Sequence, residues 1–195
     1  MSAEELIPYV TPEAYLQFEK TALTKHEYDD GVIVAMAGAK NDHISISGDL
    51  TLFVGLQLRG TNCRLRNNDQ RVHVVECNCY FHPDLTVVCG KPLYENGEGL
   101  EQLTNPSVVF EILSDSTKDR DREIKLHCYK TIPSLLHYVL ISQTPPLVEV
   151  YSRTKENRWK HYSVQELTET LNLENVGITL SLSKIYEQIE FPDTA

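Results

Sequence analysis

Two carboxylates interrupt apolar segments whose composition is typical of β-strands. Asp84 lies in the run 83–89 and Glu111 in the run 107–113, and both runs are otherwise rich in apolar and β-branched residues. A charge in such a strand costs free energy unless it is paired or bound to a metal. Either acid alone is more simply explained as an edge residue or a salt-bridge partner. The two together, followed by a helix with a lysine on its apolar side, favour a functional site.

The lysine is Lys125, in a helix predicted over 116–132. At about 100° per residue, Lys125 falls within the arc that Ile124, Cys128 and Ile132 present to the sheet. A lysine in that position needs a carboxylate partner, and the short turn after 107–113 lets it reach Glu111 and, across the sheet, Asp84. Alternatively, its stem packs and its ammonium extends to the rim.

This combination predicts metal-assisted hydrolysis. Strand alternation sets Glu111 on one face with Val109 and Leu113. Two acids on neighbouring strands that face the same way supply the hard oxygen ligands that suit Mg²⁺ or Mn²⁺. A lysine beside such a metal can position an attacking water and stabilise a developing oxyanion. That is the chemistry of phosphodiester hydrolysis.

The elements that must position these residues alternate between helix and strand. Thr11 and Pro12 are typical of a helix start, Asp30-Gly31 of a turn, and Asn41 or Asp42 of a helix cap. The segment 91–106 reads as a substrate-facing loop. Helices are predicted over 12–20, 41–58, 116–132 and 182–188, and strands over 32–36, within 62–76, over 84–89, 107–113, 135–141, 148–151 and 158–162. This order predicts an α/β fold, a sheet flanked by helices.

Length, charge and cysteine content limit the class of protein. A chain of 195 residues fits one domain, 1–195. The net charge of −10 disfavours tight nonspecific binding of nucleic acid, although residues 59–71 carry +3. No apolar run is long enough for a bilayer and the first residues lack a signal-peptide layout, so we expect a cytoplasmic protein without membrane contact. Five cysteines favour a reducing compartment, and Cys77, Cys79 and His82 lack the second pair that a zinc site needs.

The motifs together resemble a known enzyme family. Pro83-Asp84, Glu111-Ile112-Leu113-Ser114, Lys125 and Tyr129 occur in the order found in the PD-(D/E)XK nuclease superfamily, and the chain is most similar to its Uma-two family of restriction endonucleases. Glu27 to Gly31, Met36 to Ala39 and His43 extend the resemblance. It implies a restriction-endonuclease-like mixed central sheet flanked by helices, with extra C-terminal strands.

The resemblance also implies roles for individual residues. The family lysine commonly follows the glutamate by two positions, where this chain has Leu113, so a lysine migrated to Lys125 is implied, and helical spacing selects the same residue independently. A second departure is Asp115, where the family usually has proline, and we expect it to change only the turn. Asp84 and Glu111 would bind Mg²⁺ or Mn²⁺.

The resemblance suggests a role for three further residues, and each of them also has a purely structural explanation. Glu27 resembles an additional metal-binding acid, but it also flanks the Asp-Gly turn. His43 is better explained as a helix-start residue than as a base. Tyr129, one turn after Lys125, either orders the lysine or packs.

The leading hypothesis is an Mg²⁺-dependent endonuclease acting on DNA. A homodimer would supply the two sites that duplex cleavage needs. A catalytically silent nuclease-fold module that binds a protein or nucleic-acid partner is the alternative, and a hydrolase of a small phosphate compound is a third reading.

Overall fold

A six-stranded mixed sheet forms the centre of the protein. The computed structural model describes residues 9–97 and 100–191. Within this main sheet only β9 and β10 run parallel, and every other neighbouring pair is antiparallel. The spatial order is β12 (Trp159–Val164), β11 (Val148–Arg153), β10 (His137–Ser142), β9 (Val108–Leu113), β6 (Leu85–Cys89) and β3 (Cys63–Asn67).

A second six-stranded sheet lies against one face of the main sheet. Its β4 and β8 are parallel and its other pairs antiparallel. Its order is β2 (Val32–Ala35), β1 (His26–Asp29), β5 (Cys79–Phe81), β4 (Arg71–Val74), β8 (Leu100–Leu103) and β7 (Tyr94–Gly97). A two-stranded sheet, β13 (Thr170–Leu173) with β14 (Ile178–Ser181), follows the last strand of the main sheet.

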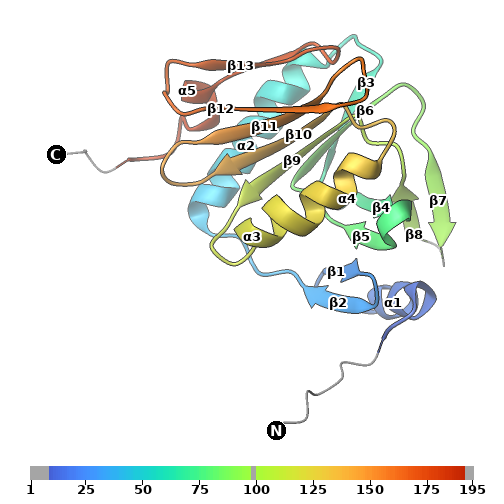
Figure 1. The fold of residues 1–195 in the computed structure, drawn as a ribbon. Helices are drawn as coiled ribbons and strands as arrows, with labels where there is room; N and C mark the ends of the chain where they lie inside the picture. The colour runs from blue at the N-terminus through green and yellow to red at the C-terminus, as the bar shows by residue number, and fades with distance from the viewer. Residues whose placement is uncertain (1–8, 98–99, 192–195) are drawn as a thin grey trace, which may run out of the picture.

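Helices cover both faces of the main sheet, and Figure 1 shows α2 and the α3–α4 helix on opposite sides of it. The first face packs on α2 (Asn41–Gln57), on β13–β14 and on α5 (Leu182–Ile185). The other face packs on the second sheet and on one continuous helix made of α3 (Lys118–Arg120), a π-helical turn η2 (Asp121–Lys125) and α4 (Leu126–Thr131). The short helices α1 (Pro12–Glu19) and η1 (Val75–Cys77) complete the second layer.

Strand β9 lies between the two layers, and its residues are therefore buried on both faces. Phe110 and Ile112 belong to the apolar cluster on the α2 side, whereas Val109 and Leu113 belong to the cluster on the α4 side. Burying an apolar side chain of this size stabilises the fold by about 1.5–3 kcal/mol. The alternation predicted for Glu111 is therefore confirmed, since it shares the α4-side face with Val109 and Leu113.

Most predicted elements are present, with three corrections. The segment 91–106 is not an unstructured loop, because it contains β7 and β8. The hairpin β13–β14 was not predicted. At the start of α2, Lys40 occupies the N-cap position without a side-chain hydrogen bond, so neither Asn41 nor Asp42 caps it.

The cysteines also differ from expectation. Cys63 is bonded to Cys89, its facing residue in the β3–β6 pair, and Cys77 is bonded to Cys128 of α4. Only Cys79 is free, and its thiol donates to Asp29 Oδ1 at 3.3 Å. Four of the five cysteines are thus oxidised, and Cys77 and Cys79 have separate partners.

In the part of the chain that the structure describes, no helix is both long and apolar enough to cross a bilayer.

Candidate active site

Lys125 lies at the centre of a buried charged cluster. Its ammonium is 2.9 Å from Glu27 Oε1, 3.1 Å from Glu111 Oε1 and 3.1 Å from Asp121 Oδ1, and the residue is 5% exposed. Burial lowers the pKa of this lysine, but the three carboxylates outweigh it and hold the pKa well above its ordinary value. The alternative in which the ammonium reaches the solvent at the rim is therefore wrong.

The three carboxylates come from three different elements. Glu27 lies in β1 of the second sheet and Glu111 in β9 of the main sheet, while Asp121 precedes Lys125 by one helical turn. The helix turns Lys125 toward both sheets, whereas Ile124, which was predicted to face the sheet, is 42% exposed. Lys125 therefore ties the two sheets and the helix together at a single point.

Glu111 is deeply buried, at 4% exposure. Burial raises its pKa well above the ordinary value, the neighbouring Lys125 opposes this shift, and the negative charges of Asp121 and Asp84 add to it. Tyr129 donates a long hydrogen bond of 3.4 Å to Glu111 Oε1, the same oxygen that Lys125 contacts. Among the described residues, Glu111 Oε2 has no hydrogen-bond donor. Tyr129 thus contacts the glutamate and not the lysine.

Asp84 lies beside Glu111 but outside the lysine's reach. Leu85 pairs with Phe110 in the antiparallel β6–β9 register, and extending this register by one residue sets Asp84 opposite Glu111. The Ile112 N–H donates to Asp84 Oδ2 at 2.7 Å. The predicted contact between Asp84 and Lys125 is not made: the carboxylates that contact the ammonium are those of Glu27, Glu111 and Asp121.

His43 completes the surroundings of Asp84. It lies in the first turn of α2, and its Nε2 is 2.9 Å from Asp84 Oδ1. The His43 side chain is 18% exposed and that of Asp84 13% exposed, so both remain accessible from outside. His43 is therefore more than a residue at a helix start, since it holds the orientation of an acid in the cluster.

Glu27 joins the cluster through two cations. Burial raises its pKa, but Lys125 and Arg120 more than offset this and lower the pKa below its ordinary value. Arg120 contacts Glu27 Oε2 directly and also lies 3.4 Å from Asp29 Oδ2, and the His82 N–H donates to Glu27 Oε1 at 3.0 Å. Glu27 thus has a structural role in joining β1 to the helix, and it remains close to Glu111.

The donor set fits a divalent cation in charge and in ligand type. The buried carboxylates around Lys125 and Arg120 outnumber these two cations, and Asp121 Oδ1 has an ion-pair contact with Lys125 but no hydrogen-bond partner. Over residues 9–97 and 100–191, no three or more His, Cys, Asp or Glu side chains are grouped so that together they could hold a metal ion. Mg²⁺ commonly takes only one or two protein carboxylates and completes its shell with water and substrate oxygens. Asp84 and the open Oε2 of Glu111 meet that requirement.

Sequence reasoning missed Asp121, Arg120 and Asp29. Asp121 lies in the first turn of the predicted helix 116–132, where an acid is ordinarily explained by the helix dipole, although it is 2% exposed. Its spacing of four residues from Lys125 was the signal that could have identified the pair. Glu27 and Asp29, the partners of Arg120, precede it by 93 and 91 residues, so no local pattern indicated them.

The chain is similar in sequence to known proteins over most of its length. The Uma2 family model, described as "Putative restriction endonuclease", matches residues 12–183. The uncharacterized protein slr1290 of Synechocystis sp. is 32% identical over 184 residues, which cover 94% of this chain and 95% of that protein. A second Synechocystis protein, sll1609, is 32% identical over 176 residues, covering 90% and 95%.

One solved structure shows the same fold. It is the crystal structure of "a putative nuclease belonging to DUF820" from Anabaena variabilis, with a TM-score of 0.75 and 19% identity over 91% of this chain and 98% of that one. This likeness confirms the predicted restriction-endonuclease-like α/β fold.

Proposed function

This chain belongs to the Uma2 family, and from that membership and the buried cluster around Lys125 we propose that it is a metal-dependent endonuclease that hydrolyses DNA phosphodiester bonds. The observation that carries the proposal is the burial of Glu111 and Lys125 together, at 4% and 5% exposure, beside Asp84. Replacing a buried ion pair with apolar residues is often neutral or stabilising, so stability alone does not explain this arrangement.

Asp84 and Glu111 are the residues that would hold the cation, with Mg²⁺ or Mn²⁺ suited to their oxygens. Such an ion, when bound, supplies charge neutralisation for the phosphate oxygens and lowers the pKa of water. His43 keeps one oxygen of Asp84 fixed at 2.9 Å, and the Ile112 N–H fixes the other at 2.7 Å. These two contacts preorganise the carboxylate, so that less reorganisation is needed during the reaction.

Lys125 would position the attacking water and stabilise the developing oxyanion. An ammonium has three N–H donors, and here three carboxylates surround it. One of them must turn away before Lys125 can donate to a water or a phosphate oxygen. Glu111 is the carboxylate to do so, because its Oε2 is open and burial holds its pKa well above the ordinary value.

The homodimer is part of the proposal, with the exposed side of α2 as its interface. Ile44, Leu52 and Leu56 are each more than half exposed along this side, at 59%, 54% and 53%, and Gly48 lies between them. Between His43 and Leu58 the only charged residue is Asp49, which is buried. Two copies that each carry −10 can meet here without opposing like charges. Leu52→Glu should convert the dimer to a monomer in sedimentation velocity.

A catalytically silent binding module is the second candidate. It is favoured by the complete coverage of the Lys125 ammonium by acids, which is also what a purely structural ion cluster would show. A cytoplasmic location stays a prediction, and the two disulfides weigh against a strongly reducing compartment.

Nicking of a supercoiled plasmid tests the endonuclease. We expect wild-type protein to convert it to open-circular DNA with Mg²⁺ or Mn²⁺ and not with chelator, and Asp84→Asn to lose the activity. Asp119→Asn makes the same chemical change at an exposed position of α3 and should retain it. Metal-independent nicking, or equal nicking by Asp84→Asn, would contradict the proposal.

A further inference from the structure

A cleft of about 400 Å³ opens beside the candidate active site. Its walls are the start of α2, the segments that follow β9 and β10, and the first turns of the α3–α4 helix. β9 and β10 are parallel neighbours, and ligands of α/β sheets commonly bind where the carboxyl ends of such strands meet. Leu113 in the wall is two residues from Glu111, and Asp42 in the wall precedes His43. The cleft and the active site therefore share β9 and α2, and the α3–α4 helix contributes residues to both.

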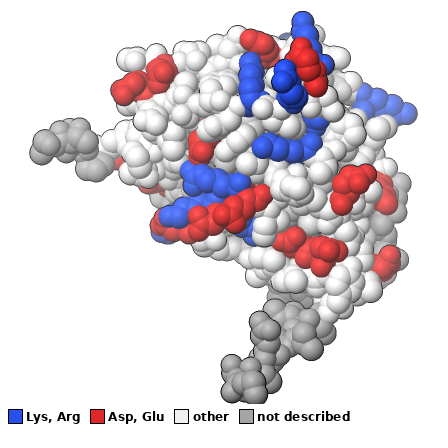
Figure 2. All heavy atoms as spheres, viewed as in Figure 1, with Lys and Arg blue, Asp and Glu red and all other residues white. Residues whose placement is uncertain are grey.

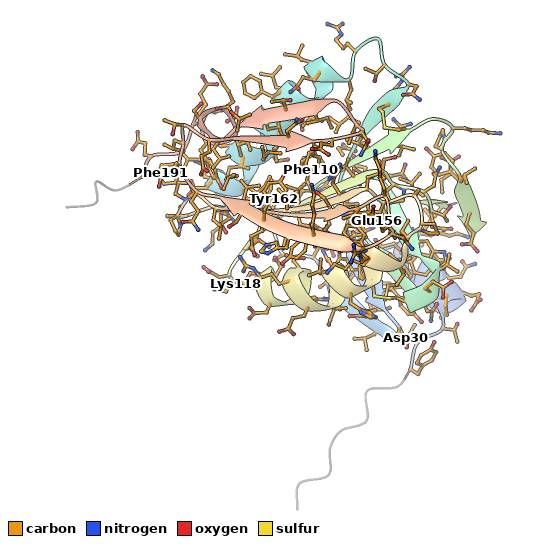
Figure 3. All side chains as sticks on the ribbon, turned by 45° about the horizontal axis from the view of Figure 1, so that its top comes forward. Asp30, Phe110, Lys118, Glu156, Tyr162 and Phe191 are labelled. Carbon is orange, nitrogen blue, oxygen red and sulfur yellow. A yellow bond between two sulfur atoms is a disulfide. The ribbon has the colours of Figure 1, made fainter. Side chains whose placement is uncertain are left out.

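Three cationic side chains line the cleft. Among the described residues Lys40 makes no ion pair, and Lys118 has only a surface contact of 3.5 Å with Asp115, of the kind worth about 0–1 kcal/mol. Figure 3 labels Lys118 at the beginning of the α3–α4 helix. Arg122 is anchored by two nitrogens, at 2.9 and 2.6 Å from Glu149 Oε2. Lys40 and Lys118 are thus the cations most available to a ligand.

The remaining lining is polar and includes uncharged donors. Ser114, Ser142 and Thr144 bring hydroxyl groups, and Gln143 is fixed by a 2.7 Å hydrogen bond from its side-chain amide to Leu113 O. Two acids, Asp42 and Asp115, also reach the cleft, so its cations outnumber its acids by one. Lysine, arginine, hydroxyl and amide donors are the groups that typically contact phosphate oxygens in protein–nucleic acid complexes.

We propose that this cleft binds a backbone phosphate of the nucleic acid next to the phosphate that is hydrolysed, with Lys40 and Lys118 as its principal contacts. The inference rests on the proposed function, because a flanking phosphate requires a polynucleotide substrate. Figure 2 shows Lys and Arg side chains interspersed with Asp and Glu over α3, with no extended basic field on the face shown. Binding of a phosphate on this face therefore needs a local site such as the cleft.

The basic stretch 59–71 lies away from the candidate active site, because its Arg59 and Arg64 line a hollow of about 300 Å³ at the end of α2 opposite His43. Arg71 is buried and lies 3.5 Å from Glu19, while Arg64 and Arg66 donate to nearby backbone carbonyls. The cleft that Lys40 and Lys118 line shares β9 and α2 with the candidate active site.

Binding of a labelled DNA duplex in chelator, followed by fluorescence anisotropy, tests this inference without cleavage. We expect Lys40→Gln/Lys118→Gln to raise the Kd roughly tenfold and to reduce the slope of log K against log[salt] by about 2, because each lost phosphate contact removes about one unit. Lys155→Gln, an exposed lysine in the β11–β12 turn, is the matched control and should change neither value. Glutamine keeps most of the side-chain length, and an unchanged melting temperature would show that the fold is intact.

The outcomes separate this inference from the nuclease assignment. Wild-type binding that depends on Lys40 and Lys118, together with no plasmid nicking, would support the cleft and overturn the endonuclease. Plasmid nicking with equal Kd and equal salt slope in wild type and the double variant would overturn the cleft alone. Absence of any duplex binding by wild type would also overturn it.

Discussion

The two faces of β9 have opposite chemistry although they belong to the same six residues. On the α2 side, Val108, Phe110 and Ile112 pack into a cluster made of apolar side chains. On the α4 side, Val109 and Leu113 flank Glu111, which meets Lys125. Since both faces are equally buried, burial alone does not explain the difference.

The two faces also differ in what their burial contributes to stability. The apolar face gains free energy from every buried carbon, at about 25 cal/mol per Å². The charged face has to desolvate Glu27, Glu111 and Asp121, and Lys125 and Arg120 compensate them only in part. A fold selected for stability alone would be expected to place apolar residues there, so the charged face indicates function.

Removing the central cation should have the largest effect. Lys125→Met keeps the stem and deletes the charge, which leaves three carboxylates buried without their shared partner. We expect a loss of about 3–5 kcal/mol in the free energy of unfolding and loss of plasmid nicking. Urea denaturation and the nicking assay measure the two effects. Lys130→Met, on the same helix but over the rings of Tyr151 and Trp159, should cost no more than about 1 kcal/mol. Equal free energies of unfolding for Lys125→Met and Lys130→Met would contradict the difference between the two faces of β9.

Opening the apolar face should affect stability without affecting the cation site. Phe110→Ala removes a ring that is 0% exposed and is expected to cost about 3–5 kcal/mol. In the protein that remains folded, the affinity for Mn²⁺ should be unchanged, because Phe110 points away from Glu111. Denaturation combined with calorimetry at low temperature separates the two quantities. A large loss of Mn²⁺ affinity in folded Phe110→Ala would mean that the two faces are not independent.

On the charged face, the metal-free protein should become more stable when Glu111 loses its charge. Burial holds the folded-state pKa of Glu111 well above the unfolded value, so its contribution is fully present at low pH and is lost as the pH rises through the folded-state pKa. Glu111→Gln cannot ionise and escapes this loss. In chelator, its melting temperature should exceed that of wild type by a margin that grows with pH. A margin that shrinks with rising pH would show the sign to be wrong.

On the apolar face, a histidine should give a smaller effect of the opposite sign. Burial lowers the pKa of His137, whose ring contacts Ser152 Oγ at 2.9 Å and Glu174 O at 2.7 Å. The stability from this residue is therefore present above the unfolded pKa of about 6.5 and is lost as the pH falls toward the folded value. His137→Gln should reduce the fall in melting temperature between pH 7 and pH 5. The same dependence of melting temperature on pH in wild type and His137→Gln would show that His137 does not contribute to it.

Local patterns were sufficient to predict the central pair. Strand alternation identified the face of Glu111, and helical spacing identified the side of Lys125. Both inferences use only neighbours in sequence, and both side chains lie where they were predicted. The extent of the domain, 1–195, stays a prediction.

Long-range contacts account for what the sequence did not reveal. β8 pairs in parallel with β4, about 30 residues earlier, so 91–106 looked like a loop. Arg120 of α3 contacts Glu27 and Asp29 of β1, and Cys77 of η1 is bonded to Cys128 of α4. Each of these pairings depends on how the layers pack, which no window of the sequence contains.

Calorimetric titration of Mn²⁺ into wild type and Glu111→Gln tests the charged face most directly. We expect wild type to bind the ion and Glu111→Gln to lose binding, because the variant replaces a carboxylate ligand by an amide. Glu123→Gln, the same change at an exposed position of the neighbouring helix, is the matched control and should bind like wild type. Equal Mn²⁺ affinity in wild type and Glu111→Gln would contradict the assignment of this face as the cation site.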